Sequence, residues 1–218
     1  MQNAIINERA LLVNSKLTER YPQPKGLLVH TNAWELLVAT ILAAQCTDAR
    51  VNLVTPVFFR RWPDPTALAK AKPEEVEEVI HSTGFFRNKA KNLIRAAHCV
   101  QIKYYGQVPK TLAELIILPG VARKTANVVL FGAFGINEGL AVDTHVARIS
   151  RRLGLTDNTN PVRIEQDLLK LFPCESWGNV NHRMVWFGRE ICLSRVPKCL
   201  FCELQFLCPA CKFEQTTG

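Results

Sequence analysis

The chain has 218 residues, and its 48% hydrophobic content is ordinary for a soluble globular protein with one large domain or two compact ones. No apolar run reaches the roughly 18–20 residues that a transmembrane helix needs, and charged residues interrupt the apolar positions near the N-terminus, so no signal peptide is expected. A surplus of 27 Lys and Arg over 19 Asp and Glu gives a formal charge of +8, which favours a polyanionic partner such as nucleic acid. A cytoplasmic protein with no membrane contact is therefore expected.

Helical periodicity dominates the sequence, and no stretch alternates convincingly as a strand. Proline at the first helical position predicts helix starts at Pro65, Pro73 and Pro161, and glycine predicts helix ends at Gly84 and Gly106. Residues 177–190 read as the last long helix. About ten short helices with short connections predict an all-α protein. Two early segments carry apolar residues at helical spacing, which predicts one buried face each: Ile6, Ala10, Val13 and Leu17, then Trp34, Leu37, Val38, Ile41 and Leu42.

A helix, a tight turn and a second helix are predicted over residues 111–118, 119–122 and 123–134. A turn that opens directly onto a helix N-terminus leaves several backbone N–H groups unpaired and directed outward. Such a site binds phosphate without requiring a side-chain charge. Gly120, Ala122 and Arg123 are therefore candidate contacts to a phosphate.

Lys124 lies in the first turn of the second of these helices. The positive end of the helix dipole disfavours a protonated ammonium there, and a free amine is what Schiff-base chemistry requires. Lys124 is therefore a candidate nucleophile. The alternative is an ordinary solvent-facing lysine at a helix start.

Asp143 precedes another helix with apolar periodicity, in the segment Val142-Asp143-Thr144-His145. An aspartate at that position is expected to be the N-cap, because it accepts hydrogen bonds from helix N–H groups. Near a lysine, the same carboxylate can also stabilise positive charge and move protons. His145 is expected to be a hydrogen-bonding neighbour rather than a metal ligand.

Five of the eight cysteines crowd near the C-terminus, which in a chain without an export signal indicates metal binding rather than disulfides. Four of them have the spacing C-x6-C-x2-C-x5-C, which differs from the paired units of zinc modules and suits an iron–sulfur cluster: Cys192, Cys199, Cys202 and Cys208. A structural zinc site is the alternative. Cys211 falls outside the pattern as a spare thiol. The three earlier cysteines, Cys46, Cys99 and Cys174, are expected to be buried and inert.

Basic residues accompany the cysteines. Arg195 and Lys198 lie in the first interval of the pattern, beside Arg189 at the end of the preceding helix. A cluster with four protein ligands can hold such a positive loop against a phosphate backbone. The alternative is that these are solvated surface charges.

The segments LPGVARKTANVVL and VDTH, together with the four-cysteine spacing, resemble the endonuclease III family of the helix-hairpin-helix glycosylases, in order and over nearly the whole chain. The resemblance implies two helical domains with DNA in the cleft between them. One is a six-helix domain with the helix-hairpin-helix, at residues 26–136. The other is a discontinuous iron–sulfur cluster domain built from both termini, at residues 1–25 and 137–218.

The resemblance also implies an activity, that of a bifunctional base-excision DNA glycosylase and AP lyase. Lys124 falls on the family's nucleophilic lysine, which attacks C1′ of a flipped nucleotide, and Asp143 falls on its catalytic aspartate. The four cysteines fall on the ligands of a [4Fe–4S] cluster. The implied substrates are oxidised pyrimidines and abasic sites in double-stranded DNA. A monomer is expected, associated with the nucleoid if the source is bacterial.

Three further positions bear on DNA binding. Gln45 falls where the family places a glutamine that fills the vacated base stack; the alternative is a buried, hydrogen-bonded amide at a helix end. Phe85 falls where related proteins usually carry a leucine wedge, and an aromatic ring can also enter a base step; the alternative is a core position. Ala122 replaces a second glycine of the hairpin. A left-handed backbone there would cost an alanine about 1 kcal/mol; otherwise its Cβ can still crowd the phosphate, so weaker DNA binding is expected.

Two other functions compete with this one. Monofunctional adenine-mismatch glycosylases share the hairpin, the aspartate and the cluster, but they lack a lysine at the position of Lys124. A non-catalytic DNA-binding or damage-sensing protein would not need both Lys124 and Asp143. An enzyme is therefore expected.

Overall fold

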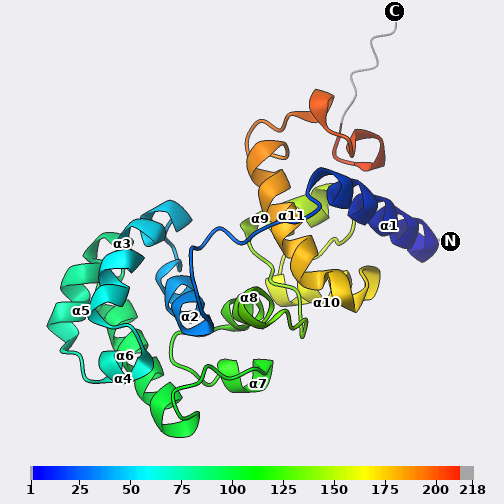
Figure 1. Cartoon of the computed structure of the whole chain (residues 1–218). Coiled ribbons are helices and arrows are strands. Elements are labelled where there is room, and N and C mark those ends of the chain that lie inside the picture. Colours follow the sequence, from blue (N-terminus) through cyan, green and yellow to red (C-terminus); the bar gives the residue numbers. More distant parts are fainter. Residues whose placement is uncertain (1, 212–218) are drawn as a thin grey trace, which may run out of the picture. The chain divides into compact units, whose positions relative to one another are not determined.

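The structure, a computed structural model, describes residues 2–211, with side chains from residue 4 onward. This part of the chain is helical and contains no strand, which confirms the all-α prediction (Figure 1). The chain divides into two compact units: a terminal unit of Met1–Lys25 and Gly139–Gly218, and a middle unit of Gly26–Glu138. The sequence predicts boundaries at 25/26 and 136/137, and in the structure the chain crosses at 25/26 and 138/139.

The helices of the middle unit are α2 (Ala33–Leu42), α3 (Asp48–Arg61), α4 (Pro65–Ala69), α5 (Pro73–Ile80), η1 (His81–Thr83), α6 (Phe86–Lys103), α7 (Leu112–Leu115) and α8 (Arg123–Phe134). Those of the terminal unit are α1 (Gln2–Arg20), α9 (Thr144–Arg152), α10 (Pro161–Leu171), η2 (Cys174–Ser176), α11 (Trp177–Glu190), η3 (Cys199–Phe201) and η4 (Gln205–Leu207). None of the helices within residues 2–211 is both long and apolar enough to cross a membrane.

Local sequence signals set many of the helix ends. The helices α4, α5 and α10 begin at Pro65, Pro73 and Pro161, as predicted, and α11 spans the predicted 177–190. Asp64 and Asn160 cap two of these proline starts, because their side-chain oxygens accept helix N–H groups at 2.8 and 2.9 Å. The fixed φ of proline and the polar residue before it therefore act together at these starts.

The middle unit is built around α2, which packs against α8. Asn32 caps α2 by accepting the Glu35 N–H at 2.9 Å, and the Glu35 carboxylate accepts the Thr31 N–H at 2.7 Å. The two helices approach closely at Gly132, where a Cβ would lie 2.7 Å from Leu36 Cδ2. The predicted face of α2 is confirmed, since all five of its members are buried: Trp34, Leu37, Val38, Ile41 and Leu42.

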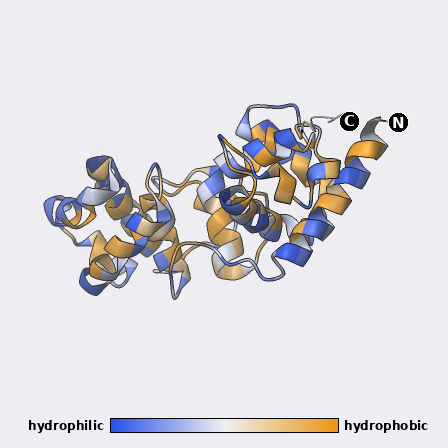
Figure 2. Ribbon diagram, turned by 90° about the horizontal axis from the view of Figure 1, so that it is seen from above, coloured by the Kyte–Doolittle hydropathy of each residue, from blue (hydrophilic) through white to orange (hydrophobic). Residues whose placement is uncertain are grey.

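The terminal unit packs α1, α9, α10 and α11 around a core of its own. The predicted face of α1 is confirmed for Ala10, Val13 and Leu17, which are buried, while Ile6 is half-buried. Hydrophobic and hydrophilic stretches alternate along the helical ribbons of both units, as expected for helices that each bury one face (Figure 2).

Helix α11 bonds to the two segments of the terminal unit that lie next to its boundaries, one ending at Lys25 and the other beginning at Gly139. Trp186 Nε1 donates to the Lys25 carbonyl at 3.0 Å, and the buried Asn181 amide donates to the Ala141 carbonyl at 2.6 Å. The unit therefore fixes the points at which the chain leaves it and returns to it.

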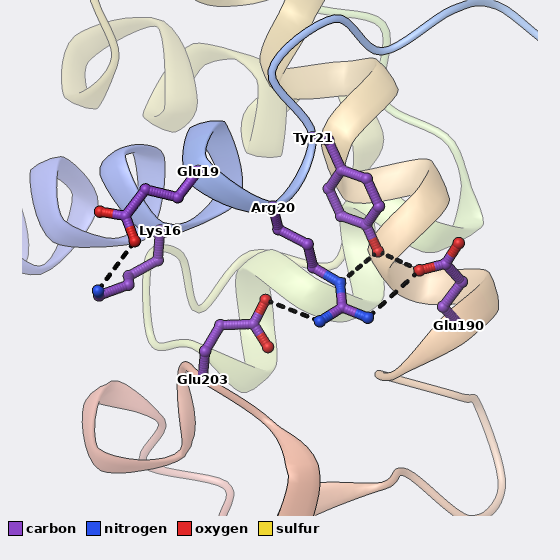
Figure 3. Close-up of polar contacts among 6 residues, drawn as sticks. All are labelled: Lys16, Glu19, Arg20, Tyr21, Glu190 and Glu203. Atoms are coloured by element: carbon purple, nitrogen blue, oxygen red, sulfur yellow. Dashed lines mark hydrogen bonds and ion pairs between the residues drawn. The ribbon is translucent and has the colours of Figure 1, made fainter.

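A small polar network ties the end of α1 to α11 and to the cysteine loop (residues 191–211), as Figure 3 shows. The Arg20 guanidinium lies 3.4 Å from both the Glu190 and the Glu203 carboxylates. The Tyr21 hydroxyl donates to Glu190 at 2.7 Å and accepts a bond from Arg20 Nε at 2.9 Å. Burial and the bond to Glu190 raise the pKa of Tyr21 to about 12, so the phenol stays protonated at neutral pH.

Candidate functional site

The predicted helix, turn and helix of residues 111–134 are present in the middle unit, but the first helix is shorter than predicted. Helix α7 covers Leu112–Leu115 rather than 111–118. After it the chain tightens into turns, in which the Leu118 N–H bonds to the Leu115 carbonyl at 3.0 Å and the Val121 N–H to the Leu118 carbonyl at 3.1 Å. Helix α8 spans the predicted residues 123–134.

Gly120 is the residue that lets this hairpin turn. Its φ of +81° lies in the left-handed region that favours glycine. A Cβ on Gly120 would also lie 3.0 Å from Asn92 Cβ on α6, closer than ordinary van der Waals contact. The turn therefore needs a glycine for its backbone conformation and for its packing against α6.

Ala122 is the N-cap of α8, and its backbone is extended, with φ −89° and ψ 167°. The alternative of a left-handed Ala122 is therefore wrong, because any residue adopts this conformation. The side chain is exposed and has no acceptor to cap α8. Weaker DNA binding through crowding of a bound phosphate by the Ala122 Cβ stays a prediction.

Lys124 is the second residue of α8, and its side chain is exposed, as is that of Arg123 before it. Gly120, Ala122, Arg123 and Lys124 thus share one turn of the middle unit and the helix start that follows it. The structure therefore presents an accessible primary amine within the first turn of a helix, where anions are also stabilised.

Asp143 lies in the terminal unit, half-buried at the start of α9. Its Oδ1 accepts the Val146 N–H at 2.8 Å, which confirms the predicted N-cap. His145, two residues on, is half-buried and hydrogen-bonds to the Arg148 guanidinium at 3.2 Å through Nδ1, which confirms the predicted hydrogen-bonding role. Burial lowers the pKa of His145, while the nearby Asp143 carboxylate acts in the opposite direction.

Gln45 and Phe85 both lie in the middle unit, and both are exposed. The alternatives of a buried amide for Gln45 and a core position for Phe85 are therefore wrong. Both residues also have left-handed backbones, with φ values of +53° and +48°. Non-glycine residues seldom adopt this conformation, which favours functional positions.

The four cysteines of the C-x6-C-x2-C-x5-C pattern line a single cavity of about 170 Å³ in the terminal unit. All four are half-buried, and Cys211 lines the same cavity. Burial raises the pKa of Cys202 to about 11, and it also raises the pKa of Cys208. Thiolates in this cavity therefore need a cationic centre to stabilise them. Within residues 2–211, no group of three or more His, Cys, Asp and Glu side chains forms a recognisable site for a metal ion.

Two arginines of α9 hold the beginning of the cysteine loop, and neither is predicted from the sequence. Arg152 donates to the Leu193 and Ser194 carbonyls at 2.6 and 2.7 Å, and its Nη1 lies 3.3 Å from Cys192 Sγ. Arg148 donates to the Cys192 carbonyl at 2.9 Å. Their spacing of four residues on one helix is the only local signal that they share a face.

The remaining predicted residues lie apart from these contacts. Arg195 and Lys198 are exposed on the cysteine loop, as a contact to phosphate or to solvent requires. The expectation of buried, inert thiols is wrong for Cys174, which is exposed at η2, and only partly met by Cys46 and Cys99, which are half-buried. Cys174 is the first residue of a short 3-10 turn that contains no buried residue.

The fold and the hairpin define a class of DNA repair protein. Residues 38–174 match the model of the HhH-GPD superfamily of base excision DNA repair proteins. The chain is 52% identical over 203 residues to an endonuclease III from Synechocystis, covering 93% of each chain, and 43% identical to one from Bacillus subtilis, covering 88% of each. The chain therefore belongs to the endonuclease III family, and it is a base excision repair DNA glycosylase with an associated lyase activity.

Solved structures agree with this assignment. A non-covalent endonuclease III–DNA complex matches with a TM-score of 0.89 and 41% identity, covering 94% of this chain and 95% of that one. A trapped covalent endonuclease III–DNA intermediate matches with the same TM-score and identity. A thermostable thymine-DNA glycosylase shares the fold, with a TM-score of 0.85 and 23% identity.

Proposed function

We propose that this chain excises oxidised pyrimidines from duplex DNA and then cleaves the strand at the abasic site, with Lys124 as the nucleophile and Asp143 as the group that moves protons. The observation that carries the assignment is the accessible amine of Lys124 in the first turn of α8, four residues after the tight turn at Gly120. A helix start that binds a phosphate places the adjacent sugar within reach of a side chain in the first turn.

The chemistry proceeds through a covalent intermediate. The Lys124 amine forms a bond to C1′ of the damaged nucleotide, and the glycosidic bond breaks with its electron pair leaving on the base. The sugar ring then opens to a Schiff base, and loss of the C2′ proton expels the 3′ phosphate by β-elimination. Hydrolysis of the Schiff base returns the amine. The Asp143 carboxylate is suited to accept and return the protons and to stabilise the cationic intermediates.

Borohydride trapping tests the nucleophile. The protein is incubated with duplex DNA that carries one thymine glycol, then with borohydride, and the products are separated on a denaturing gel. The wild type and Lys103→Gln, which removes an exposed lysine at the far end of α6, should both form a covalent adduct, and Lys124→Gln should not. DNA binding by Lys124→Gln should persist, because the amine is needed for chemistry rather than for affinity.

Other results would change the proposal. An adduct that persists in Lys124→Gln would reject Lys124 as the nucleophile. An adduct on an abasic-site duplex but not on thymine glycol would confirm the lyase step. It would also show that the bases this chain excises belong to another class of lesion. No adduct on either duplex would indicate a DNA-binding module without catalysis.

We further propose that Cys192, Cys199, Cys202 and Cys208 hold a [4Fe–4S] cluster. The donor set has the required chemistry, because four half-buried thiols line one cavity and burial disfavours uncompensated thiolates there. When bound, the cluster supplies four metal–sulfur links that hold the cysteine loop, and Arg152 lies close enough to donate to the Cys192 sulfur.

Cys211 provides a matched control for the cluster, because it lines the same cavity but lies outside the spacing. Cys208→Ser should lose iron and the visible absorbance of an iron–sulfur cluster, while Cys211→Ser should keep both. Zinc in place of iron in the purified wild type would reject the cluster in favour of a structural zinc site.

The DNA contacts are also a proposal. Gly120, Ala122 and Arg123 are suited to bind phosphate at the helix start, and Arg195 and Lys198 to bind it from the cysteine loop. Each phosphate contact contributes about −0.9 to the slope of log affinity against log salt. Lys198→Gln and Arg195→Gln should therefore each make that negative slope shallower by about one unit. An unchanged slope would mean that both residues are solvated surface charges.

A further inference from the structure

Two exposed side chains of the middle unit stand on unusual backbone. Of the three non-glycine residues with positive φ in the described part of the chain, two are Gln45 and Phe85, and the third is Tyr105. A left-handed conformation costs a side-chain-bearing residue roughly 1–2 kcal/mol, so it persists only where the surroundings impose it. Gln45 follows α2 by three residues, and Phe85 is the N-cap of α6. A contact within the middle unit must therefore hold these two loops in these conformations.

Lys89 lies between the two loops, and it is a buried cation with only 5% of its surface exposed. Its ammonium donates to the Leu42 carbonyl at 2.8 Å and to the Thr83 carbonyl at 2.7 Å. Leu42 is the last residue of α2, and Thr83 is the last residue of η1. One ammonium therefore joins the two helix ends from which the loops of Gln45 and Phe85 depart.

The location of this charge is unfavourable in two respects. Lys89 lies in the first turn of α6, where the helix dipole opposes a cation, and burial lowers the pKa of its ammonium, with the Cys46 thiol acting in the opposite direction. No carboxylate within residues 2–211 forms an ion pair with it. A buried cation without an ion pair is costly, so ordinary helix capping, for which an exposed donor suffices, is a poor account of it.

The bonds have a geometric consequence that a capping role lacks. Leu42 and Lys89 are 47 residues apart in the chain, whereas Thr83 and Lys89 are six apart. The same side chain also belongs to α6, whose N-cap is Phe85, and the Lys89 N–H bonds to the Phe85 carbonyl at 3.0 Å. Lys89 therefore fixes the position of Gln45's loop relative to Phe85 itself.

We propose that Lys89 is a positioning residue that locks the loops of Gln45 and Phe85 into one geometry, so that the two side chains enter the DNA at the flipped nucleotide as a pair. The inference rests on the proposed function and on the expected roles of the two side chains, Gln45 filling the vacated base stack and Phe85 entering a base step. The buried ammonium makes no contact with DNA; it acts through the two carbonyls.

A fluorescent base measures this role directly. The probe is a duplex in which 2-aminopurine lies beside a tetrahydrofuran abasic analogue, so that entry of the protein's side chains unstacks the probe and raises its fluorescence. Gln45→Ala and Phe85→Ala are each measured in the wild-type background and in Lys89→Met. Residues in one network show interaction energies that correspond to factors of several-fold to a hundredfold in an equilibrium constant. Lys89→Met should therefore lower the equilibrium constant for unstacking the probe on the order of tenfold.

The expected pattern is non-additive. Each alanine variant should lower the unstacking equilibrium in the wild-type background, and neither should lower it further once Lys89→Met is present. Borohydride trapping on single-stranded abasic DNA, which needs no flipping, should remain normal in Lys89→Met and show that the chemistry of Lys124 is intact.

Stability is separated from positioning by two further variants. Val76→Ala removes buried volume from the same core at α5 and should lower the melting temperature without changing the probe. Lys89→Arg keeps the positive charge but replaces the ammonium by a longer, forked guanidinium. The guanidinium cannot occupy the position of the ammonium between the Leu42 and Thr83 carbonyls, so the probe signal should fall. Lys89→Arg replaces Lys89→Met in the experiment if Lys89→Met does not fold.

Three results would overturn the inference. The signal of both Lys89 variants could stay at the wild-type level, Val76→Ala could lose the signal in proportion to its stability, or the alanine variants could remain fully additive in Lys89→Met. If Gln45→Ala and Phe85→Ala leave the wild-type signal unchanged, the proposed role of those side chains fails first and removes the basis of the inference.

Discussion

Gly120→Ala is the sharpest test of how the hairpin is built. The substitution places a Cβ on a residue with φ of +81°, 3.0 Å from Asn92 Cβ. The left-handed backbone costs roughly 1–2 kcal/mol for alanine, and displacing a packed neighbour adds roughly 1–3 kcal/mol. The reduced entropy of the unfolded chain offsets about 0.4–1 kcal/mol. We therefore expect the free energy of unfolding to fall by roughly 1–5 kcal/mol.

Ala122→Gly is the matched control, since it lies two residues away in the same turn. Ala122 already has an extended backbone, so glycine relieves no strain there and should lower stability by about 0.4–1 kcal/mol through the unfolded state. Thermal unfolding followed by circular dichroism measures both variants, at roughly 2–4 °C per kcal/mol for a chain of this length.

The two variants can refute this reasoning independently. A Gly120→Ala protein as stable as the wild type would show that neither the backbone conformation nor the contact with Asn92 constrains the turn. An Ala122→Gly protein more stable than the wild type would show that Ala122 is strained after all. The DNA affinity of Ala122→Gly, compared with that of the wild type, then tests the effect of the Ala122 methyl group alone. Tighter, salt-dependent binding by Ala122→Gly would show that the methyl group crowds the phosphate.

Substitutions at three further positions have defined outcomes. Asp143→Asn keeps a side-chain oxygen to cap α9, so single-turnover excision should slow by about 10²–10⁴-fold with little change in melting temperature. Asp143→Ala removes the cap as well, so its free energy of unfolding should also fall by about 0.5–2 kcal/mol. A collapse of stability in Asp143→Asn would mean that the capping role of Asp143 outweighs its catalytic role. Tyr21 has a folded pKa of about 12 against an ordinary 10.0, so its stabilising contribution is complete below pH 10 and lost as pH rises through 12. Tyr21→Phe should therefore flatten the loss of stability between these values and remove the latest phase of tyrosinate absorbance near 295 nm, and an unchanged titration would contradict the network of Figure 3. Arg152→Met removes the donors to Leu193, Ser194 and Cys192 Sγ, so a chelator should bleach the absorbance of the proposed iron–sulfur cluster faster than in the wild type. Equal rates would exclude a role in holding the loop.

Much of the fold was predictable because its signals are local. The proline starts at Pro65, Pro73 and Pro161 and the cap at Asp143 depend on bonds between residues three or four positions apart, so the order of amino acids is sufficient to locate them. The hairpin was predicted for the same reason. Its first helix was predicted too long, because the turns at residues 116–121 compete with helix over the same apolar residues.

The sequence by itself therefore determined the helices, the helix start that carries Lys124 and the crowding of cysteines near one end of the chain. Only the tertiary structure decided that Gln45 and Phe85 are exposed on left-handed backbone, that Ala122 is extended and that Arg152 reaches the cysteine loop 42 residues away. It also decided the burial of Lys89, whose partner at Leu42 lies 47 residues away. These features depend on which distant backbone carbonyls the packing brings within hydrogen-bond distance, and neither residue type nor short-range periodicity specifies that.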